Sequence, residues 1–541
     1  MLTTLDYSIL AAYFAATLAI GFWSARRAKT SSKDFFVAEK RLPWWVVGFT
    51  MVAAGISAEQ MLGEVGYGMD VGLVVSNWDL AVFPSLALMV LIFLPIYLRS
   101  GITTIPEYLE KRYSQTTRLL FTGYTVFNNA CVTLVMVLAL GATALKHFLG
   151  LPPLWGVTLL AVFSGLYTVA GGMSSVAWTD TFQCVLLLLG GLTVFGVGLA
   201  HVPGGWDGLL SRMPEPHLIR GLDDVCMPWP GLILLALSTN VWYCCTNQFY
   251  VQSCLGAKDR WHGQMGVLLT AFLGPVLTLC CAFPGYIARD LLNHGLLPPL
   301  PTGADGVADA NATLPHLVNQ FIGPGLRGFV VAAVLAAIMS SVSSIVNATA
   351  SVFTIDLYQR WLRPRASEAQ LVRVGRFAGT VTLLIAAPLT LVALRYKYIF
   401  IYSQNAWCIL AIPIMLAFTL GVLWKRTTAA ATTVTFLLVL PFVAVPFVLG
   451  DSSWLTLPLL GVKMHLFTFA FWLWLVAALV MVAVSLMTKA PDAAAIARYV
   501  WSPTAGRDDG ARASQRPWFK RVGFWCAVAG VMYFVIYVKF W

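Results

Sequence analysis

Charge is what this sequence has least of. Asp, Glu, Lys and Arg make up only 11% of its 541 residues, whereas a soluble domain has about 25%. Hydrophobic residues make up 59%, and the mean hydropathy is +0.77. No stretch between the apolar segments approaches the roughly 100 residues that a soluble catalytic domain needs. The composition therefore predicts an all-α, polytopic membrane protein and argues against an enzyme.

Cysteine spacings that would mark a metal centre or a disulfide framework are also lacking. Ten Cys are present, and all except Cys226 fall in or beside apolar segments, so we expect buried small hydrophobic side chains. No basic residues precede the first apolar segment, Tyr7–Trp23, which predicts an uncleaved helix rather than a signal peptide. We expect no organic cofactor, no nucleic-acid partner and no obligate protein partner. The expected partners are a small-molecule substrate and the lipid bilayer.

Fourteen apolar segments are long enough to cross a bilayer, which takes roughly 20 residues each. They cover about 7–24, 43–66, 72–98, 117–148, 153–171, 177–201, 229–253, 264–290, 326–356, 370–394, 398–423, 428–449, 464–487 and 519–540. Threading them alternately places 26 of the 35 Lys and Arg residues on one side, which is then the cytoplasm. This asymmetry predicts that both termini lie outside, in a plasma membrane, and the compact loops favour a bacterial inner membrane.

Two apolar segments hold clusters of small and polar residues that lipid would not tolerate. They are VAAGISAEQMLG (Val52–Gly63) and AAIMSSVSSIVN (Ala336–Asn347). Polar groups that find no partner at membrane depth cost several kcal/mol, so they persist where they are buried in protein or bind something. Hydroxyl and carbonyl oxygens are the ligands of a hard monovalent cation, which predicts a sodium site. The alternative is that the serines pack helices closely or bond to their own backbone.

Five strings resemble one family. They are DFFVAEKRLPWWVVG (Asp34–Gly48), ISAEQ (Ile56–Gln60), GITTIPEYLEKRY (Gly101–Tyr113), YTVAGGMSSVAWTDTFQ (Tyr167–Gln183) and SSVSSIVNATASVFTIDLYQ (Ser340–Gln359). Together they are similar to the sodium/solute symporter family, and most of all to its sodium/sugar cotransporter branch. The resemblance implies sodium-coupled symport of a small polar solute, a sugar or sugar-like polyol, by alternating access.

The resemblance also implies a leucine-transporter-type fold with two inverted five-helix repeats. The expected divisions are a first helix and loop (1–42), the first repeat (43–201), an outer loop (202–228), the second repeat (229–423), two additional helices (424–488), a cytoplasmic linker (489–518) and a last helix (519–541). In such folds the first helix of each repeat is broken beside the binding site. We expect these breaks at Ala54-Gly55 and at Ser238-Thr239-Asn240.

Ligands for sodium follow from the resemblance, residue by residue. Backbone carbonyls of Ala53, Ile56 and Ala337 and the hydroxyls of Ser340 and Ser341 would form a first sodium site. Asp180, Ser343 and Ser344 would form a second. The alternative for Asp180 is that it caps the start of its helix.

The resemblance places the solute among amides, one carboxylate and aromatic rings. The residues implied are Gln60, Asp79, Asn240 and Gln404 as polar contacts, Trp78, Tyr243 and Phe400 as aromatic gates, and Glu64 as an extra acid near the pocket. Sugar carriers typically have a Lys where this chain has Gly274, and a Glu where it has Asp79, so other solutes stay open: amino sugars, sialic acid, organic or amino acids. A proton-coupled carrier using Asp180 or Glu64 is the rival mechanism. Glu59 and the PEYLEKRY string are interpreted as structural, forming intracellular salt bridges or helix-end contacts.

Overall fold

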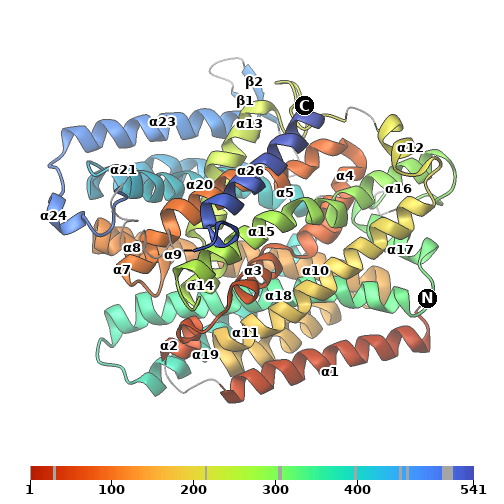
Figure 1. The fold of residues 1–541 in the computed structure, drawn as a ribbon, viewed down its shortest axis with the longest axis horizontal. Coiled ribbons are helices and arrows are strands. Elements are labelled where there is room, and N and C mark those ends of the chain that lie inside the picture. Colours follow the sequence, from red (N-terminus) through yellow and green to blue (C-terminus); the bar gives the residue numbers. More distant parts are fainter. Residues whose placement is uncertain are drawn as a thin grey trace.

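A computed structural model shows that the chain is almost entirely helical (Figure 1). The structure describes residues 2–27, 32–213, 216–302, 308–394, 399–449, 454–457, 462–502 and 516–541. Part of the predicted cytoplasmic linker, residues 503–515, lies outside this set. Among the described residues, ten helices are long and apolar enough to cross a membrane, or eleven if one sharply bent pair counts as a single span. The number fourteen therefore stays a prediction.

The elements of the first half are α1 (Thr4–Arg27), α2 (Ser32–Val37), α3 (Trp44–Gly55), α4 (Val65–Val71), α5 (Asn77–Leu80), α6 (Phe83–Leu88), α7 (Leu94–Ser100), α8 (Ile105–Arg112), α9 (Gln115–Asn128), α10 (Leu134–Leu149), α11 (Pro153–Ala200) and α12 (Gly205–Arg212). The second half has α13 (Trp229–Leu234), α14 (Gln248–Leu255), α15 (Arg260–Cys281), α16 (Phe283–Asn293), α17 (Thr313–Phe321), α18 (Leu326–Val352), α19 (Glu368–Ala393), α20 (Ile399–Leu423), α21 (Ala429–Val439), α22 (Val445–Leu449), β1 (Trp454–Leu457), β2 (Val462–His465), α23 (Leu466–Met487), α24 (Ala493–Ile496) and α26 (Val522–Lys539).

The first helix break lies where the sequence predicts it. Helix α3 ends at Gly55, and Ile56 is extended (φ −106°, ψ 118°). The chain becomes helical again in a wide π-helical turn, Glu59–Glu64, which continues into α4, and the segment Glu59–Val71 is bent by 56° relative to α3. Glycine at the end of α3 favours this break, since Gly costs about 1 kcal/mol relative to Ala inside a helix.

The second break differs from its predicted position. Ser238, Thr239 and Asn240 stay helical, and the chain becomes extended only at Asn247 (φ −80°, ψ 125°), directly before α14. Side chains from neighbouring helices bond to carbonyls along this stretch. Tyr97 Oη donates to the carbonyl of Cys245 at 2.7 Å. This carbonyl, in the last turn before Asn247, therefore has a hydrogen-bond partner within the protein and is not left exposed to lipid.

Helices α11 and α18 form the centre of the molecule and lie side by side, with α1 packed against them (Figure 1). Every side chain of α18 from Val330 to Val352 is buried. Helix α11 is kinked at Gly172, which has φ 59°. A Cβ atom there would lie 2.4 Å from the carbonyl oxygen of Phe35, so only glycine fits.

Both chain ends lie on the side of the molecule that carries the short helices α12 and α17 (Figure 1). The Asp6 carboxylate accepts from the backbone N–H groups of Gly325 and Gly328, each at 2.8 Å. At the other end, Leu218 N donates to the carbonyl of Phe540 at 2.8 Å. The β1–β2 hairpin was not predicted. That the shared side faces outward rests on the charge asymmetry and stays a prediction.

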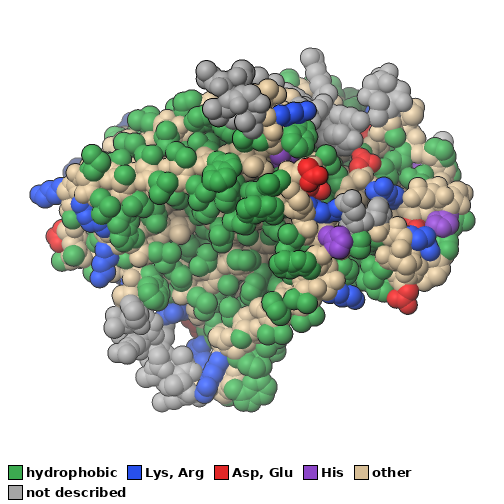
Figure 2. Space-filling model, turned by 90° about the horizontal axis from the view of Figure 1, so that it is seen from above, with side chains coloured by type: hydrophobic (Ala, Val, Ile, Leu, Met, Phe, Trp, Pro, Cys, Tyr) green, Lys and Arg blue, Asp and Glu red, His purple; other side chains and the backbone are tan. Residues whose placement is uncertain are grey.

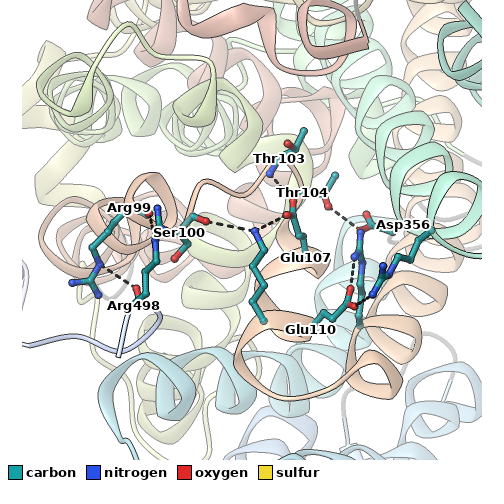
Figure 3. Close-up of polar contacts among 11 residues, drawn as sticks. Arg99, Ser100, Thr103, Thr104, Glu107, Glu110, Asp356 and Arg498 are labelled. Carbon is teal, nitrogen blue, oxygen red and sulfur yellow. Dashed lines mark hydrogen bonds and ion pairs between the residues drawn. The ribbon is translucent and has the colours of Figure 1, made fainter. Parts of the chain in front are cut away.

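Apolar side chains dominate the middle of the surface, and charged side chains gather toward the two ends of the long axis (Figure 2). The end opposite the chain termini holds a network of buried ion pairs (Figure 3). Arg118 pairs with two carboxylates. Its Nε donates to Asp356 Oδ1 at 2.7 Å, and its guanidinium also pairs with Glu110. Glu110 pairs with Arg360 as well. Partial burial alone would raise the pKa of Glu110, but hydrogen bonds from the two arginines hold that pKa below its usual value. The interpretation of PEYLEKRY as a structural element is consistent with these contacts.

Replacing Arg118 with alanine would leave the fully buried Asp356 carboxylate without its cation. Breaking a buried pair in this way costs about 3–5 kcal/mol, so we expect R118A to unfold several degrees below the wild type in detergent. R360A is the control, because the Arg360 side chain is 48% exposed and an exposed pair is worth about 1 kcal/mol or less. Equal melting temperatures for R118A and R360A would contradict the role given to the buried pair.

Candidate functional site

Five oxygen atoms from two helices converge at the break in α3. Ser340 Oγ lies 2.9 Å from the Ala53 carbonyl oxygen and 3.0 Å from that of Ala337. Ser341 Oγ lies 3.4, 3.3 and 3.2 Å from the carbonyl oxygens of Ala53, Ile56 and Ala337. All five residues are buried. The structure thus brings together the whole set that the sequence predicts for a first sodium site.

The break explains why the Ala53 carbonyl is available. In an unbroken helix it would accept from the N–H of Ser57 four residues later. Here Ser57 N instead donates to Gln60 Oε1 at 2.8 Å. The Ala53 oxygen therefore points toward α18, where it lies within hydrogen-bond distance of the Ser340 and Ser341 hydroxyls. Five neutral oxygens in a dry interior suit a dehydrated monovalent cation, since they replace its water shell without adding charge.

The second predicted cluster also assembles, one turn further along α18. Asp180 on α11 is fully buried, and its two oxygens accept from Ser343 Oγ at 3.2 Å and Ser344 Oγ at 2.9 Å. Asp180 lies well inside α11, eight residues beyond the kink at Gly172, so it does not cap a helix start. Ser343 Oγ also lies 2.8 Å from the carbonyl oxygen of Ser340, three residues earlier in the same helix, so its one proton has two possible acceptors.

A pocket adjoins the broken helix and leaves about 680 Å³ free of protein atoms. Six of the eight residues predicted to contact the solute line it: Gln60, Trp78, Asp79, Asn240, Tyr243 and Gln404. Gly55 and Ile56 line it as well, so the pocket and the first oxygen cluster share Ile56.

Phe400 and Glu64 do not line the pocket. The Phe400 ring meets the Trp78 ring edge-on, with ring centroids 5.4 Å apart. Glu64 is fully buried, and neither of its carboxylate oxygens has a hydrogen-bond partner within the described part of the chain.

Sequence reasoning missed two aromatic rings of the pocket, Tyr250 and Trp407. Trp407 lies three residues after Gln404 on α20, so helical spacing alone could have placed it on the same face. Tyr250 could not be placed in this way, because the break at Asn247 changes the direction of the chain before it. Tyr250 closes against Gly55, where a Cβ would lie 3.0 Å from its ring.

Glu59 was expected to form an intracellular salt bridge or a helix-end contact. It begins the π-helical turn Glu59–Glu64, which fits a helix-end contact, and it is 4% exposed and contacts the pocket residue Gln404. Its Oε1 accepts from Ser403 Oγ and, at 3.3 Å, from Gln404 Nε2. The bend after α3 turns this part of the chain into the interior, so Glu59 positions the amide of Gln404.

Comparisons with known proteins agree with this architecture. The family model described as "Sodium:solute symporter family" matches residues 35–437. The sodium/glucose cotransporter of Vibrio parahaemolyticus is 33% identical over 460 residues, which cover 82% of this chain and 84% of that protein. The sodium/myo-inositol cotransporter 2 of Mus musculus is 32% identical over 455 residues, covering 78% of this chain and 67% of the relative.

Among solved structures, a substrate-bound, outward-open Na⁺-coupled sialic acid symporter superposes with a TM-score of 0.77. The superposition covers 91% of this chain and 99% of that one, at 19% sequence identity. At this identity the likeness concerns the fold alone, and it confirms the predicted leucine-transporter-type architecture.

Proposed function

Because this chain belongs to the sodium:solute symporter family, we propose that the oxygen cluster at the α3 break is the site where its coupling ion binds. The chain is a multi-pass membrane transporter, not an enzyme, and sodium is the ion that drives it. Its cargo is a small polar solute of the sugar or polyol kind. The bacterial relative at 33% identity supports a bacterial inner membrane as its location.

The convergence of Ser340 and Ser341 with three carbonyls carries this proposal. Sodium there would tie α3 to α18, two helices that belong to different repeats of the expected fold. A ligand shifts a conformational equilibrium only if it binds one state better than the other. A site made of two helices meets this condition, because separating them removes part of the ligand set. Sodium entering from outside would stabilise the outward-open form, and both ligands would leave inward.

Ile56 gives the ion and the solute a shared contact. Its carbonyl belongs to the oxygen cluster, while the residue also lines the pocket. An ion that fixes the extended backbone at Ile56 thereby fixes one wall of the pocket. This supports positive coupling, in which sodium raises the affinity for solute and solute raises the affinity for sodium.

We assign Asp180, Ser343 and Ser344 as a second sodium site. The carboxylate is fully buried and its hydrogen bonds come from neutral hydroxyls, so a cation there would gain a full charge partner. Ser343 follows Ser340 by three residues on α18, so the two proposed sites lie about one helical turn apart. Two ions would square the accumulation that a sodium gradient supports.

The pocket residues have distinct roles in this proposal. Amide groups of Gln60, Asn240 and Gln404 would exchange hydrogen bonds with solute hydroxyls, and Asp79 would accept from them. Trp78 and Tyr243 would pack on the apolar face of the ring. Phe400 would hold the Trp78 ring in place by their edge-on contact, and Glu64 would act on the pocket through its proximity to Asp79.

Gln404→Ala tests this assignment. The variant would lose one amide contact to the solute, worth about 1 kcal/mol, so we expect roughly a fivefold rise in KM for the solute. The sodium concentration for half-maximal uptake should stay near that of the wild type once the solute is saturating. An unchanged KM would remove Gln404 from the solute site.

Coupling to sodium is tested against coupling to protons in proteoliposomes. Uptake of solute under an imposed inward sodium gradient is compared with uptake under an imposed inward proton gradient in potassium buffer. We expect accumulation with sodium and none with protons. Uptake that follows the proton gradient would favour the rival mechanism, with Asp180 or Glu64 as the proton site.

A further inference from the structure

The pocket has an acidic side chain and no basic one to balance it. Asp79 lines the pocket and is 7% exposed, yet its Oδ2 is buried without a hydrogen-bond donor within the described chain. The pocket lining includes no Lys, Arg or His among the residues that the structure describes. Thr278 on α15 provides the neutral hydroxyl that faces the carboxylate.

Two more carboxyl groups lie close to Asp79, again with neutral surroundings. Glu64 is near enough to both Asp79 and Glu59 to repel them, and neither of its own oxygens is bonded. Glu59 is held by a serine hydroxyl and an amide. Other groups that face Asp79 are the thiols of Cys280 and Cys281 and the phenol of Tyr533. Asp79 therefore lines the pocket with two more buried carboxyl groups close to it, and the described lining holds no basic side chain.

The last helix fills the space beside Gly274 on α15. Gly274 and Asp79 both line the pocket, and a Cβ added at Gly274 would lie 2.1 Å from the Tyr533 hydroxyl of α26 and 3.4 Å from the Asp79 backbone oxygen. That hydroxyl is fixed by a 2.8 Å hydrogen bond to the Ala271 carbonyl. A longer side chain at position 274 would therefore meet the Tyr533 side chain, and the described lining offers Asp79 no basic partner.

Aromatic rings form the walls opposite the acid. Tyr243 packs against Tyr250, with centroids 5.3 Å apart, and against Trp407 at 6.1 Å. All three line the pocket together with Trp78. The faces of such rings attract ammonium groups, more strongly where water is excluded. The amide groups of Gln60, Asn240 and Gln404 line the same pocket and can bond to hydroxyls of the solute. Asn240 Nδ2 is a buried donor without a partner in the described residues.

We propose that the transported solute carries a protonated amino group on a polyhydroxylated ring, as amino sugars and aminocyclitols do, and that its ammonium binds Asp79. This inference rests on the proposed function, since it takes the pocket beside Ile56 to be the solute site. The ammonium donates to Asp79 Oδ2, and the ring hydroxyls meet the amides. A charge-assisted hydrogen bond in a dry site is about twice as strong as a neutral one.

The test uses pairs of solutes that differ by one group. D-glucosamine is compared with D-glucose, D-galactosamine with D-galactose, and scyllo-inosamine with scyllo-inositol, at pH about 6, where amines are protonated. Sialic acid is included as an anionic probe. Affinity is measured by thermal stabilisation of the purified, full-length transporter, once in sodium and once in potassium.

We expect the amine of at least one pair to bind at least about tenfold more tightly than its hydroxyl twin, and sialic acid not to bind. Asp79→Asn should remove that preference, whereas Asp207→Asn, the same change on the exposed face of α12, should keep it. The inference is overturned if the hydroxyl twin binds as tightly in every pair, if sialic acid is preferred, or if no probe stabilises the protein.

The same data separate this inference from sodium coupling. Amine preference that is equal in sodium and in potassium would support the charge of the solute and contradict the proposed function. Sodium-dependent binding of the neutral sugars, as tight as that of the amines, would support the proposed function and contradict the charge assigned to the solute. If Asp79→Asn does not fold, the paired comparison on the wild type still decides.

Discussion

Ser341→Ala is expected to weaken strongly the activation of solute uptake by sodium. The substitution removes an oxygen that lies within 3.4 Å of three others in the first cluster. A hydrogen-bonding contact to a charged partner is worth about 1.5–3 kcal/mol, so the sodium concentration for half-maximal uptake should rise roughly 10- to 150-fold. Uptake measured against sodium concentration in proteoliposomes gives this value directly.

The matched control for this variant is Ser351→Ala. Ser351 lies on the same helix and is equally buried, but its hydroxyl donates to the Asn347 carbonyl in its own helix, at 2.7 Å. S351A should keep the sodium activation of the wild type, and melting curves of both variants show whether either is misfolded. A Ser341 variant that folds and retains wild-type activation by sodium would remove this residue from the ion site.

Asp180→Asn is expected to halve the number of sodium ions moved per solute. At zero membrane potential, a tenfold sodium gradient sustains about 100-fold solute accumulation with two coupled ions and about tenfold with one. The wild type should therefore reach the higher value and D180N the lower one, because an amide cannot balance the charge of a second ion. The ratio is read at steady state in proteoliposomes, and using the sodium gradient alone makes it independent of the charge of the solute.

Ser344→Ala tests the same site without changing a charge. Ser344 Oγ contacts the carboxylate at 2.9 Å, so this variant should also move toward tenfold accumulation, or require more sodium to reach the wild-type ratio. A wild type that never exceeds tenfold accumulation would show that one ion suffices, and Asp180 would then be a structural acid.

Much of the ion site could be predicted because its signal is local. Ser340 and Ser341 stand out inside a segment that is otherwise apolar, and the small residues at Ala54-Gly55 mark a weak point in a membrane helix.

Features that depend on distant residues were predicted poorly. The second break moved to Asn247 because side chains from other helices, such as Tyr97, take up carbonyls before it. Glu59 was expected to form an intracellular salt bridge or a helix-end contact, and its contact with Ser403 was not predicted, because the 56° bend after α3 turns it inward. Tyr250 reaches the pocket only because the chain changes direction at the break. No periodicity within one segment reports such contacts between segments.

The central claim is that oxygens of α3 and α18 hold sodium between them, and an experimental structure determined in sodium tests it most directly. We predict density for one ion enclosed by the carbonyl oxygens of Ala53, Ile56 and Ala337 and the hydroxyls of Ser340 and Ser341, lost when choline replaces sodium. Maps that resolve these side chains and show the two hydroxyls turned away from Ala53, with no ion between the helices in sodium, would contradict the account.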